Sequence, residues 1–401
     1  MTGSGDLEEA WRRHWTGLVA GLVRRYRDFG VAEDAAADAF AAAARTWPVD
    51  GVPDSPGAWL YTAARHRADD QLRHRGVARR KAPLLLVDDA GPASDDRLRL
   101  IFTCCHPALS LQARVGLTLR YVLGVPTCEV ARLLLVSEST MAARLTRARS
   151  KLKAAGIRYR IPDPEELPRR LASVTAVVYL AFTRGYAPRS GGEVVEVDAA
   201  AEAVELGRLL HMLMPQETSV TALLALMLLQ HARRDARQDE HGDLVLLPDQ
   251  DRARWYHGEI AEAVWLLRGL SKRGVTDERY FLEACIAAQH GVAETAAQTN
   301  WRRIGDYYRR LEAVTGSAVV RLNRAVAVAE VAGPLEGLRL LETLDEPLGR
   351  FHMLAAVRAD FLARLGRDEQ AVRQYRLAIE LADTAAQRRF LADRLEQVAN
   401  R

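Results

Sequence analysis

The sequence has little cysteine and no long hydrophobic run. Four cysteines in 401 residues are too few for a disulfide framework, which indicates a reducing compartment. The longest apolar stretch, near Val220 to Leu229, is too short to cross a bilayer. The N-terminus carries Gly, Ser and acidic residues where a signal sequence would be basic and then apolar. We therefore expect a cytoplasmic protein without a membrane partner.

The sequence also lacks the common motifs of enzymes. It contains no GxxxxGK(S/T) phosphate loop, GxSxG elbow, HExxH zinc motif or Rossmann glycine pattern. Cys104-Cys105-His106 suggests zinc, but adjacent cysteines do not form the separated pairs of a tetrahedral site, and only Cys128 and Cys285 remain. Buried small side chains are the favoured interpretation. We expect no catalytic residue, no metal and no cofactor, and hence no enzyme.

Charge is distributed unevenly along the chain. Residues 1–160 hold 25 Lys and Arg against 17 Asp and Glu, whereas residues 161–401 hold 31 against 35. Within residues 97–160, twelve basic side chains are offset only by Glu129 and Glu138. A local charge of +10 on so short a segment favours a polyanionic partner over an ordinary solvated surface.

Helical periodicity runs through almost the whole chain. Apolar residues recur at helical spacing along residues 18–29, and Ser55-Pro56 is typical of a helix start. A stretch rich in Gly, Pro and charge separates two small helical units, and IPDPEELP ends the second. We expect an all-α protein with these segments: a helical domain at 8–75, a linker at 76–96, a second helical domain at 97–160, a helical extension domain at 162–290 and helical repeats at 291–401.

The C-terminal half contains two further patterns. Residues 237–248, RQDEHGDLVLLP, predict a short β-hairpin with its turn near His241-Gly242. Four small or apolar positions recur after 34 residues, which resembles tetratricopeptide repeats. The recurring positions are Ala325, Gly337, Leu341 and Leu344, followed by Ala359, Ala371, Tyr375 and Ala378. Tyr307 lies 34 residues before Leu341 and so occupies the same position of the repeat, although its neighbours match poorly.

Residues 111–153 carry the clearest functional pattern, a helix-turn-helix. Ser110 and Thr127 are placed to cap two helices, and a tight turn at Val136-Ser137 leads into a third. One face of the third helix is apolar and consists of Met141, Leu145, Ala148 and Leu152. The rest is polar and basic, as a recognition helix in the major groove requires, although a basic amphipathic surface helix is the alternative. We assign to DNA binding Ser139, Thr140, Arg144, Thr146, Arg147, Arg149 and Lys151.

Two segments together resemble one protein family. LTLRYVLGVPTCEVARLLLVSESTMAARLTRARSKLK resembles region 4, the −35 promoter-binding region, of extracytoplasmic-function (ECF) sigma factors in the sigma-70 family. AEDAAADAFAAAARTWP followed by PGAWLYTAARHRADDQLRHR resembles their region 2. Residues 162–401 are similar to the extension of one group of these factors, notably around LPDQDRARW and the tetratricopeptide-like end. The resemblance identifies residues 8–75 as region 2 and residues 97–160 as region 4.

The resemblance also implies roles for residues of region 2. The acidic second helix would bind the β′ clamp helices of core RNA polymerase through Glu33, Asp34, Asp38 and Phe40. The third helix would bind and melt the −10 element through Trp59, Arg65, Arg67, Arg73 and Arg75. The loop at 52–57 would hold a flipped base. Stacking groups and cations suit single-stranded DNA, although a core position for Trp59 is an equal alternative. Ala143 departs from the family, which commonly has a small hydroxyl residue there.

The prediction is therefore a sigma factor that binds core RNA polymerase, through its β′ and β subunits, and promoter DNA. It would direct transcription initiation by −35 recognition and −10 melting. The acidic extension would regulate it by packing on the sigma domains or by receiving a protein partner. One alternative is a helix-turn-helix regulator with a helical sensory domain and no sigma activity. Another is a tetratricopeptide-like scaffold or a metal hydrolase that uses Cys104, Cys105 and His106.

Overall fold

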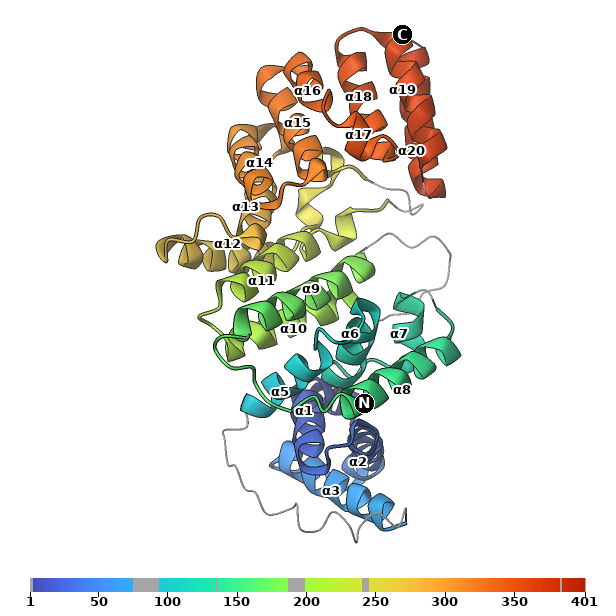
Figure 1. Cartoon of the computed structure of the whole chain (residues 1–401), viewed down its shortest axis with the longest axis vertical. Coiled ribbons are helices and arrows are strands. Elements are labelled where there is room, and N and C mark those ends of the chain that lie inside the picture. The colour runs from blue at the N-terminus through green and yellow to red at the C-terminus, as the bar shows by residue number, and fades with distance from the viewer. Residues whose placement is uncertain are drawn as a thin grey trace. The chain divides into compact units, whose positions relative to one another are not determined.

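The computed structural model describes residues 3–74, 94–134, 136–186, 199–239, 245–382 and 384–400 (Figure 1). These residues are mostly helical and contain no β-strand, which confirms the expected all-α class. The predicted hairpin turn at His241-Gly242 lies outside the described residues. Its flanks form no strand, although the Val245 amide donates a hydrogen bond to the Arg237 carbonyl at 2.9 Å.

Contacts divide the chain into two compact units. Unit 1 comprises Met1–Gly185 and Val197–Leu213, and unit 2 comprises Tyr186–Glu196 and Met214–Arg401. The elements of unit 1 are α1 (Gly3–Tyr26), α2 (Phe29–Asp50), α3 (Pro56–His74), α5 (Ser94–Cys104), α6 (Leu111–Leu117), the π-helix η2 (Thr118–Val122), α7 (Thr127–Leu133), α8 (Glu138–Ala154), α9 (Leu167–Tyr186) and α10 (Ala199–Leu213). Although α9 and α10 come from the sequence of the extension, their contacts thus group them with the two N-terminal domains.

The first three helices form a small bundle. Alanines line the buried side of α2, and Ala36, Ala39 and Ala43 have no exposed surface. Such small side chains let α2 approach α1 and α3 closely, so that large residues such as Trp15 and Leu60 fill the space between them. Asp34 and Asp38 of α2 are exposed on the surface of this bundle.

The helix-turn-helix is built on α6, α7 and α8. The Ser110 hydroxyl accepts a hydrogen bond from the Ala113 amide, so Ser110 caps α6 as predicted. Thr127 does not cap α7: it is the first helical residue, Pro126 holds the cap position, and no side chain bonds there. The proline fixes its backbone at φ −56° before the helix, and its carbonyl accepts hydrogen bonds from the Glu129 and Val130 amides.

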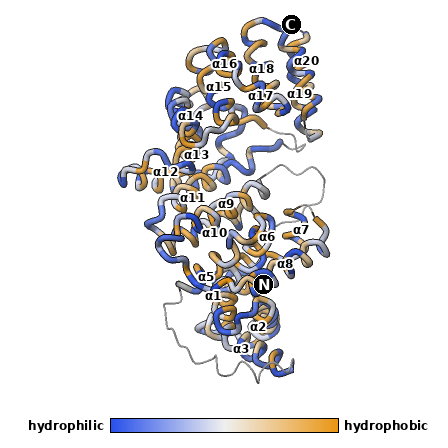
Figure 2. The backbone as a smooth tube through the Cα atoms, viewed as in Figure 1, coloured by the Kyte–Doolittle hydropathy of each residue, from blue (hydrophilic) through white to orange (hydrophobic). Residues whose placement is uncertain are grey.

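Unit 2 is a series of helices, of which most pack on the next along the chain. They are α11 (Thr218–His231), α12 (His257–Lys272), α13 (Arg279–Gly291), α14 (Trp301–Thr315), α15 (Ala318–Ala332), α16 (Pro334–Leu341), α17 (Asp345–Leu348), α18 (His352–Arg364), α19 (Asp368–Leu381) and α20 (Ala385–Ala399). Three-residue 3-10 turns lie at Arg234–Ala236, Leu247–Asp249, Arg252–Arg254 and Ala296–Gln298. Hydrophobic and hydrophilic residues alternate along most helices, so that each buries one side (Figure 2).

Two helix pairs of unit 2 recur at an interval of 34 residues. The pair α15 and α16 begins at Ala318 and Pro334, and the pair α18 and α19 begins at His352 and Asp368. The eight repeating positions named from the sequence are all buried. A Cβ on Gly337 would lie 2.6 Å from the Phe361 ring, which explains the small residue at that position. Their assignment as tetratricopeptide repeats stays a prediction.

Candidate nucleic-acid and polymerase interface

The predicted recognition helix is α8, and its side chains separate as the spacing indicated. Ser137 caps the helix by accepting a hydrogen bond from the Thr140 amide. The four apolar residues of the predicted core face are buried. Five of the seven residues assigned to DNA are exposed: Ser139, Thr140, Thr146, Arg147 and Lys151. The helix therefore presents hydroxyls at its start and cations along its length, which can contact base edges and phosphates.

Arg144 and Arg149 are less accessible than the other five. Arg144 is half-buried on α8. Arg149 turns toward the N-terminal bundle, where its Nη1 lies 3.9 Å from Glu33 Oε2 and its side chain is 32% exposed. In this arrangement Arg149 is thus directed at α2.

The predicted −10 element lies on α3. Trp59 is half-buried, and its ring meets that of Trp47 edge-on at 5.7 Å. It is therefore packed in part, as a core residue would be, and exposed in part, as a residue that stacks on DNA would be. Arg67 and Arg73 are exposed and Arg65 is half-buried. Arg75 lies outside the described residues. In the loop at 52–57, Val52, Asp54 and Ser55 are exposed and the other three residues are half-buried.

The residues predicted to bind polymerase divide into three groups. Asp34 and Asp38, one turn apart on α2, are exposed on a common face. Phe40 is buried, with its ring 4.7 Å from that of Trp11, and so belongs to the core of the bundle. Glu33 is only 15% exposed because it receives a guanidinium from the helix-turn-helix. The exposed acidic residues of this set are therefore Asp34, which accepts a hydrogen bond from Gln71 at 3.1 Å, and Asp38.

The partner of Glu33 is Arg120, which the sequence interpretation did not select. Arg120 Nε donates to Glu33 Oε1 at 2.6 Å, and its Nη2 also contacts this oxygen. Arg120 Nη1 donates to the Val125 carbonyl at 3.2 Å, which fixes the guanidinium between the two domains. Glu33 was selected for polymerase, but no local pattern indicated its contact with Arg120, because the two positions lie 87 residues apart. Only the π-helical turn that holds Arg120 marks the position as unusual, and sequence patterns do not reveal such turns.

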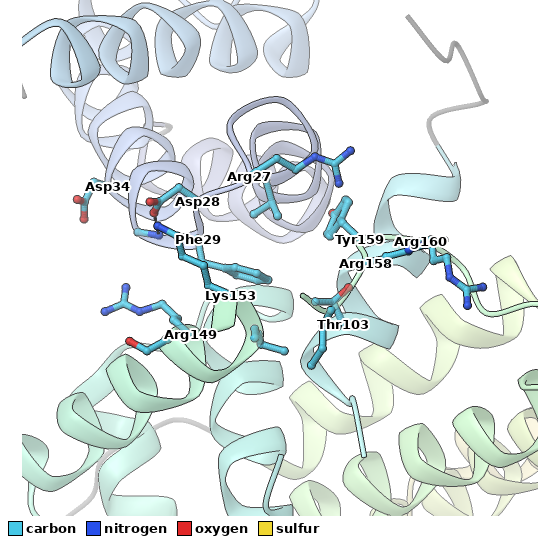
Figure 3. A pocket seen from close by; sticks show the side chains of 15 residues that line it. Arg27, Asp28, Phe29, Asp34, Thr103, Arg149, Lys153, Arg158, Tyr159 and Arg160 are labelled. Atoms are coloured by element: carbon cyan, nitrogen blue, oxygen red, sulfur yellow. Dashed lines mark hydrogen bonds between the residues drawn. The ribbon is translucent and has the colours of Figure 1, made fainter. Parts of the chain in front are cut away.

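A cleft of about 840 Å³ lies beside this contact, between the α1–α2 junction and the end of α8 (Figure 3). Five of its fifteen lining residues are basic: Arg27, Arg149, Lys153, Arg158 and Arg160. Its two acidic residues are Asp28, which caps α2, and Asp34. The cleft is thus a cationic opening between the two N-terminal domains.

The cysteines lie at the base of the helix-turn-helix. Cys104 and Cys105 are buried, and burial raises the pKa of the Cys105 thiol to about 11. The Cys105 carbonyl accepts a hydrogen bond from Ser173 at 2.8 Å. In the described part of the chain, no three His, Cys, Asp or Glu residues gather as metal ligands would. None of its helices has the length and hydrophobicity of a membrane span.

Three segments of the chain match protein families. Residues 11–77 match Sigma-70 region 2, and residues 99–152 match Sigma-70, region 4. Residues 170–270 match a family of unknown function, DUF6596, which spans α9 to α12. The two sigma matches cover the bundle α1–α3 and the helix-turn-helix.

Similar proteins extend this result. An uncharacterized protein of Rhizobium meliloti is 36% identical over 100% of this chain and 97% of its own length. The probable ECF RNA polymerase sigma factor SigI of Mycobacterium tuberculosis is 27% identical over 39% of this chain and 58% of its length. The ECF RNA polymerase sigma factor SigK of Mycobacterium ulcerans is 30% identical over 36% of this chain and 82% of its length. No solved structure matches the chain.

Proposed function

We propose that this chain, which belongs to the sigma-70 family as an ECF-type member with a helical C-terminal extension, binds core RNA polymerase and selects promoters by contacting both their −35 and −10 elements. The observation that carries the proposal is the presence of both sigma domains in family order. A simple repressor or activator needs only the helix-turn-helix. The additional presence of region 2 is explained if the chain also binds RNA polymerase.

Region 4 would read duplex DNA through α8. Its first turn offers Ser139 and Thr140 to base edges, and Arg147 and Lys151 lie farther along the exposed side. Region 2 would bind polymerase through Asp34 and Asp38 and would hold the melted strand through Arg65, Arg67 and Arg73 of α3. Trp59 supplies a half-buried ring at the start of the same helix.

The chain itself would catalyse no reaction, because phosphodiester chemistry belongs to the polymerase. Its place of action would be the cytoplasm, where core polymerase and promoters are found. These assignments follow from the proposed partners.

The extension would regulate the sigma domains through α9. Arg170 of α9 donates to the Phe102 carbonyl at 2.6 Å, and Ser173 donates to the Cys105 carbonyl and contacts Arg114. Carbonyls at the C-terminal end of α5 accept these hydrogen bonds, so that α9 is bound to the helix that precedes the helix-turn-helix. A partner that bound the extension and displaced α9 would break these hydrogen bonds to region 4. Replacing Arg170 and Ser173 with Ala should change promoter-dependent transcription by the full chain, and unchanged transcription would argue against this regulatory role.

Run-off transcription with purified core polymerase tests the main proposal. The template would carry the region upstream of the chain's own gene, with a second template of unrelated sequence as control. We expect a discrete transcript only when chain, core polymerase and the first template are combined. Tight binding to duplex DNA without polymerase, and no association with core enzyme, would favour a conventional helix-turn-helix regulator instead.

A further inference from the structure

Helix α12 of unit 2 carries a tryptophan on its outer side. All seven tryptophans of the chain lie in the described residues, and six of them are buried or half-buried. Trp265, at the middle of α12, is 70% exposed. Tryptophan is among the residue types that contribute most to protein interfaces, because it buries a large apolar area with little loss of side-chain freedom. Trp265 therefore marks α12 as a candidate interaction surface.

Helix α12 buries one side and leaves the other open. Its buried residues pack against α11 and α13, and they are Ile260, Ala263, Leu266, Leu267 and Leu270. Figure 1 shows α12 at the edge of unit 2. The opposite side, which we call the α12 face, consists of five exposed residues at helical spacing: Ala261, Trp265, Arg268, Gly269 and Lys272.

The glycine of the α12 face is not explained by packing within the chain. Gly269 lies inside a helix, where glycine is less favourable than alanine because it loses more backbone freedom on folding. An added Cβ on Gly269 would meet nothing within 4 Å in the described structure. A small residue at this position is explained if a second helix approaches α12 closely from outside, beside the large ring of Trp265.

The α12 face is complementary to itself when two copies pair in antiparallel orientation. Ala261 and Gly269 lie four residues before and after Trp265, so each small residue lies opposite a small residue of the other copy. Glu262 and Arg268 lie three residues before and after Trp265. Each half-buried Glu262 therefore reaches the level of the exposed Arg268 of the other copy. A parallel pair would place like charges at the same level, so both size and charge favour the antiparallel pair.

Other occupants fit the α12 face less well. A nucleic acid would be attracted by Arg268 and Lys272, but residues 161–401 carry 35 acidic against 31 basic side chains, which opposes a polyanion. An acidic protein would meet the two cations, but it would not require small residues on both sides of Trp265. A second copy accounts for the glycine, the tryptophan and the opposite charges together.

We infer that two copies of this chain associate through the α12 face, with their α12 helices antiparallel about a two-fold axis and the two Trp265 rings packed at the centre. The inference concerns unit 2 and goes beyond the proposed function. One helix from each copy buries less surface than a permanent dimer needs, so the association is reversible, with a dissociation constant of about 10 µM. The fraction of dimer then follows the concentration of the chain.

Sedimentation velocity of the full chain tests the association. Between about 1 µM and about 100 µM, which brackets the expected constant, the natural chain should pass from monomer to dimer. Trp265→Ala should weaken association by about 30-fold, as loss of a central aromatic residue usually does. Val331→Ala removes another exposed apolar side chain, from α15, and as the matched control it should associate like the natural chain. A natural chain that stays monomeric, or a Trp265→Ala chain that associates equally well, would overturn the inference.

Gly269→Gln separates the interface from the stability of the helix. Glutamine favours a helix and would meet no neighbour within the chain, so the free energy of unfolding should stay the same or rise. Association should nevertheless weaken by about tenfold, because the added side chain would hold the two helices apart. Urea titration and sedimentation of the same samples give both quantities. Undiminished association of this variant would contradict a close helix pair.

A mixing experiment tests the antiparallel arrangement. Arg268→Glu places two acids at each level of the pair, and Glu262→Arg places two cations there, so each variant alone should associate about tenfold more weakly. An equal mixture of the two variants pairs opposite charges at both levels and should recover the affinity of the natural chain. Circular dichroism would confirm that both variants are folded. A mixture that associates no better than either variant alone would rule out this arrangement.

Two binding measurements cover the other occupants of the α12 face. The natural chain and Trp265→Ala would be compared in the anisotropy of a labelled single-stranded oligonucleotide and in biolayer interferometry with core polymerase. We expect the two chains to bind each probe equally. Weaker binding of one probe by Trp265→Ala would assign the α12 face to that partner in place of a second copy.

Discussion

At the scale of single residues, one helix supplies three kinds of side chain. Along α8, Met141 and Leu145 are buried, Arg147 is exposed, and Arg149 bonds to another domain. The first two assignments were predictable because helical spacing alone separates an apolar from a polar side. The third was not, because the partner of Arg149 lies on α2 and no local pattern reports it. The partial burial of Arg149 is therefore the main difference between the predicted DNA-binding face of α8 and the exposure of its side chains.

Arg147 offers the simplest test of DNA recognition. Arg147→Ala removes an exposed cation from the middle of the proposed DNA face without disturbing the buried side of α8. We expect the complex with core polymerase to bind a −35 duplex about tenfold more weakly, as loss of an arginine contact usually causes. Anisotropy of a labelled duplex would measure the change. Arg339→Ala, which removes a cation from unit 2, should have no effect, and equal loss in both variants would contradict the assignment.

Asp34 and Asp38 provide the corresponding test for polymerase. Replacing both with Arg reverses the charge of the exposed face of α2, so binding to a basic partner surface should fall by about 100-fold through repulsion. The dissociation constant for core polymerase, measured by biolayer interferometry, reports this change. Glu342→Arg, an exposed acid of unit 2, is the matched control. Retained affinity in the double variant would show that polymerase binds elsewhere on the chain.

At the scale of elements, local sequence predicted the positions of the helices better than it predicted their termini and their contacts. The Ser110 cap, the core of α8 and the 34-residue interval of helix pairs depend on residues close in sequence. The Pro126 cap and the π-helical turn η2 were missed because each depends on backbone geometry that several residue types permit. The packing of region 2 on region 4 was missed for a different reason: it depends on contacts such as Thr16 to Val122, 106 residues apart.

Gly124 tests how tightly the end of η2 is held against α1. Its backbone has φ 75°, and an added Cβ would lie 2.8 Å from Trp11 Nε1 and 2.9 Å from Trp15 Nε1. Gly124→Ala should therefore lower the free energy of unfolding by about 2–4 kcal/mol, from backbone strain and overpacking together. Gly274 has φ 79° with nothing within 4 Å, so Gly274→Ala should cost only the strain, about 1 kcal/mol. Urea titrations would give both values, and equal losses would mean that the indoles move aside freely.

At the scale of the whole molecule, the division into units does not follow the division of the sequence. The family match of residues 170–270 begins in α9, which belongs to unit 1, and ends in α12, which belongs to unit 2. The extension is therefore not an independent appendage, because its first helix is bonded to region 4. The hydrogen bonds of Arg170 and Ser173 tie α9 to the end of α5 within unit 1.

Acid should destabilise unit 2 through His290. Burial, together with the nearby Arg233 and Arg252, lowers the pKa of this imidazole from 6.5 to about 4, and its ring meets that of Trp301 edge-on at 5.3 Å. As pH falls from 6.5 to 4, the unfolded chain takes up a proton that the folded chain does not bind, so the free energy of unfolding decreases over this window. The decrease should be about 2 kcal/mol, because the ring is only partly shielded from solvent.

Glu278, whose pKa burial raises, acts in the opposite direction in the same unit, so the comparison must be made with a His290→Gln variant. The free energy of unfolding would be measured by urea titration, with hydrogen exchange reporting on the region around Trp301. Between pH 6.5 and 4.5 we expect it to fall more for the natural chain than for this variant. An equal dependence of the free energy of unfolding on pH in both chains would show that His290 is accessible to protons in the folded state.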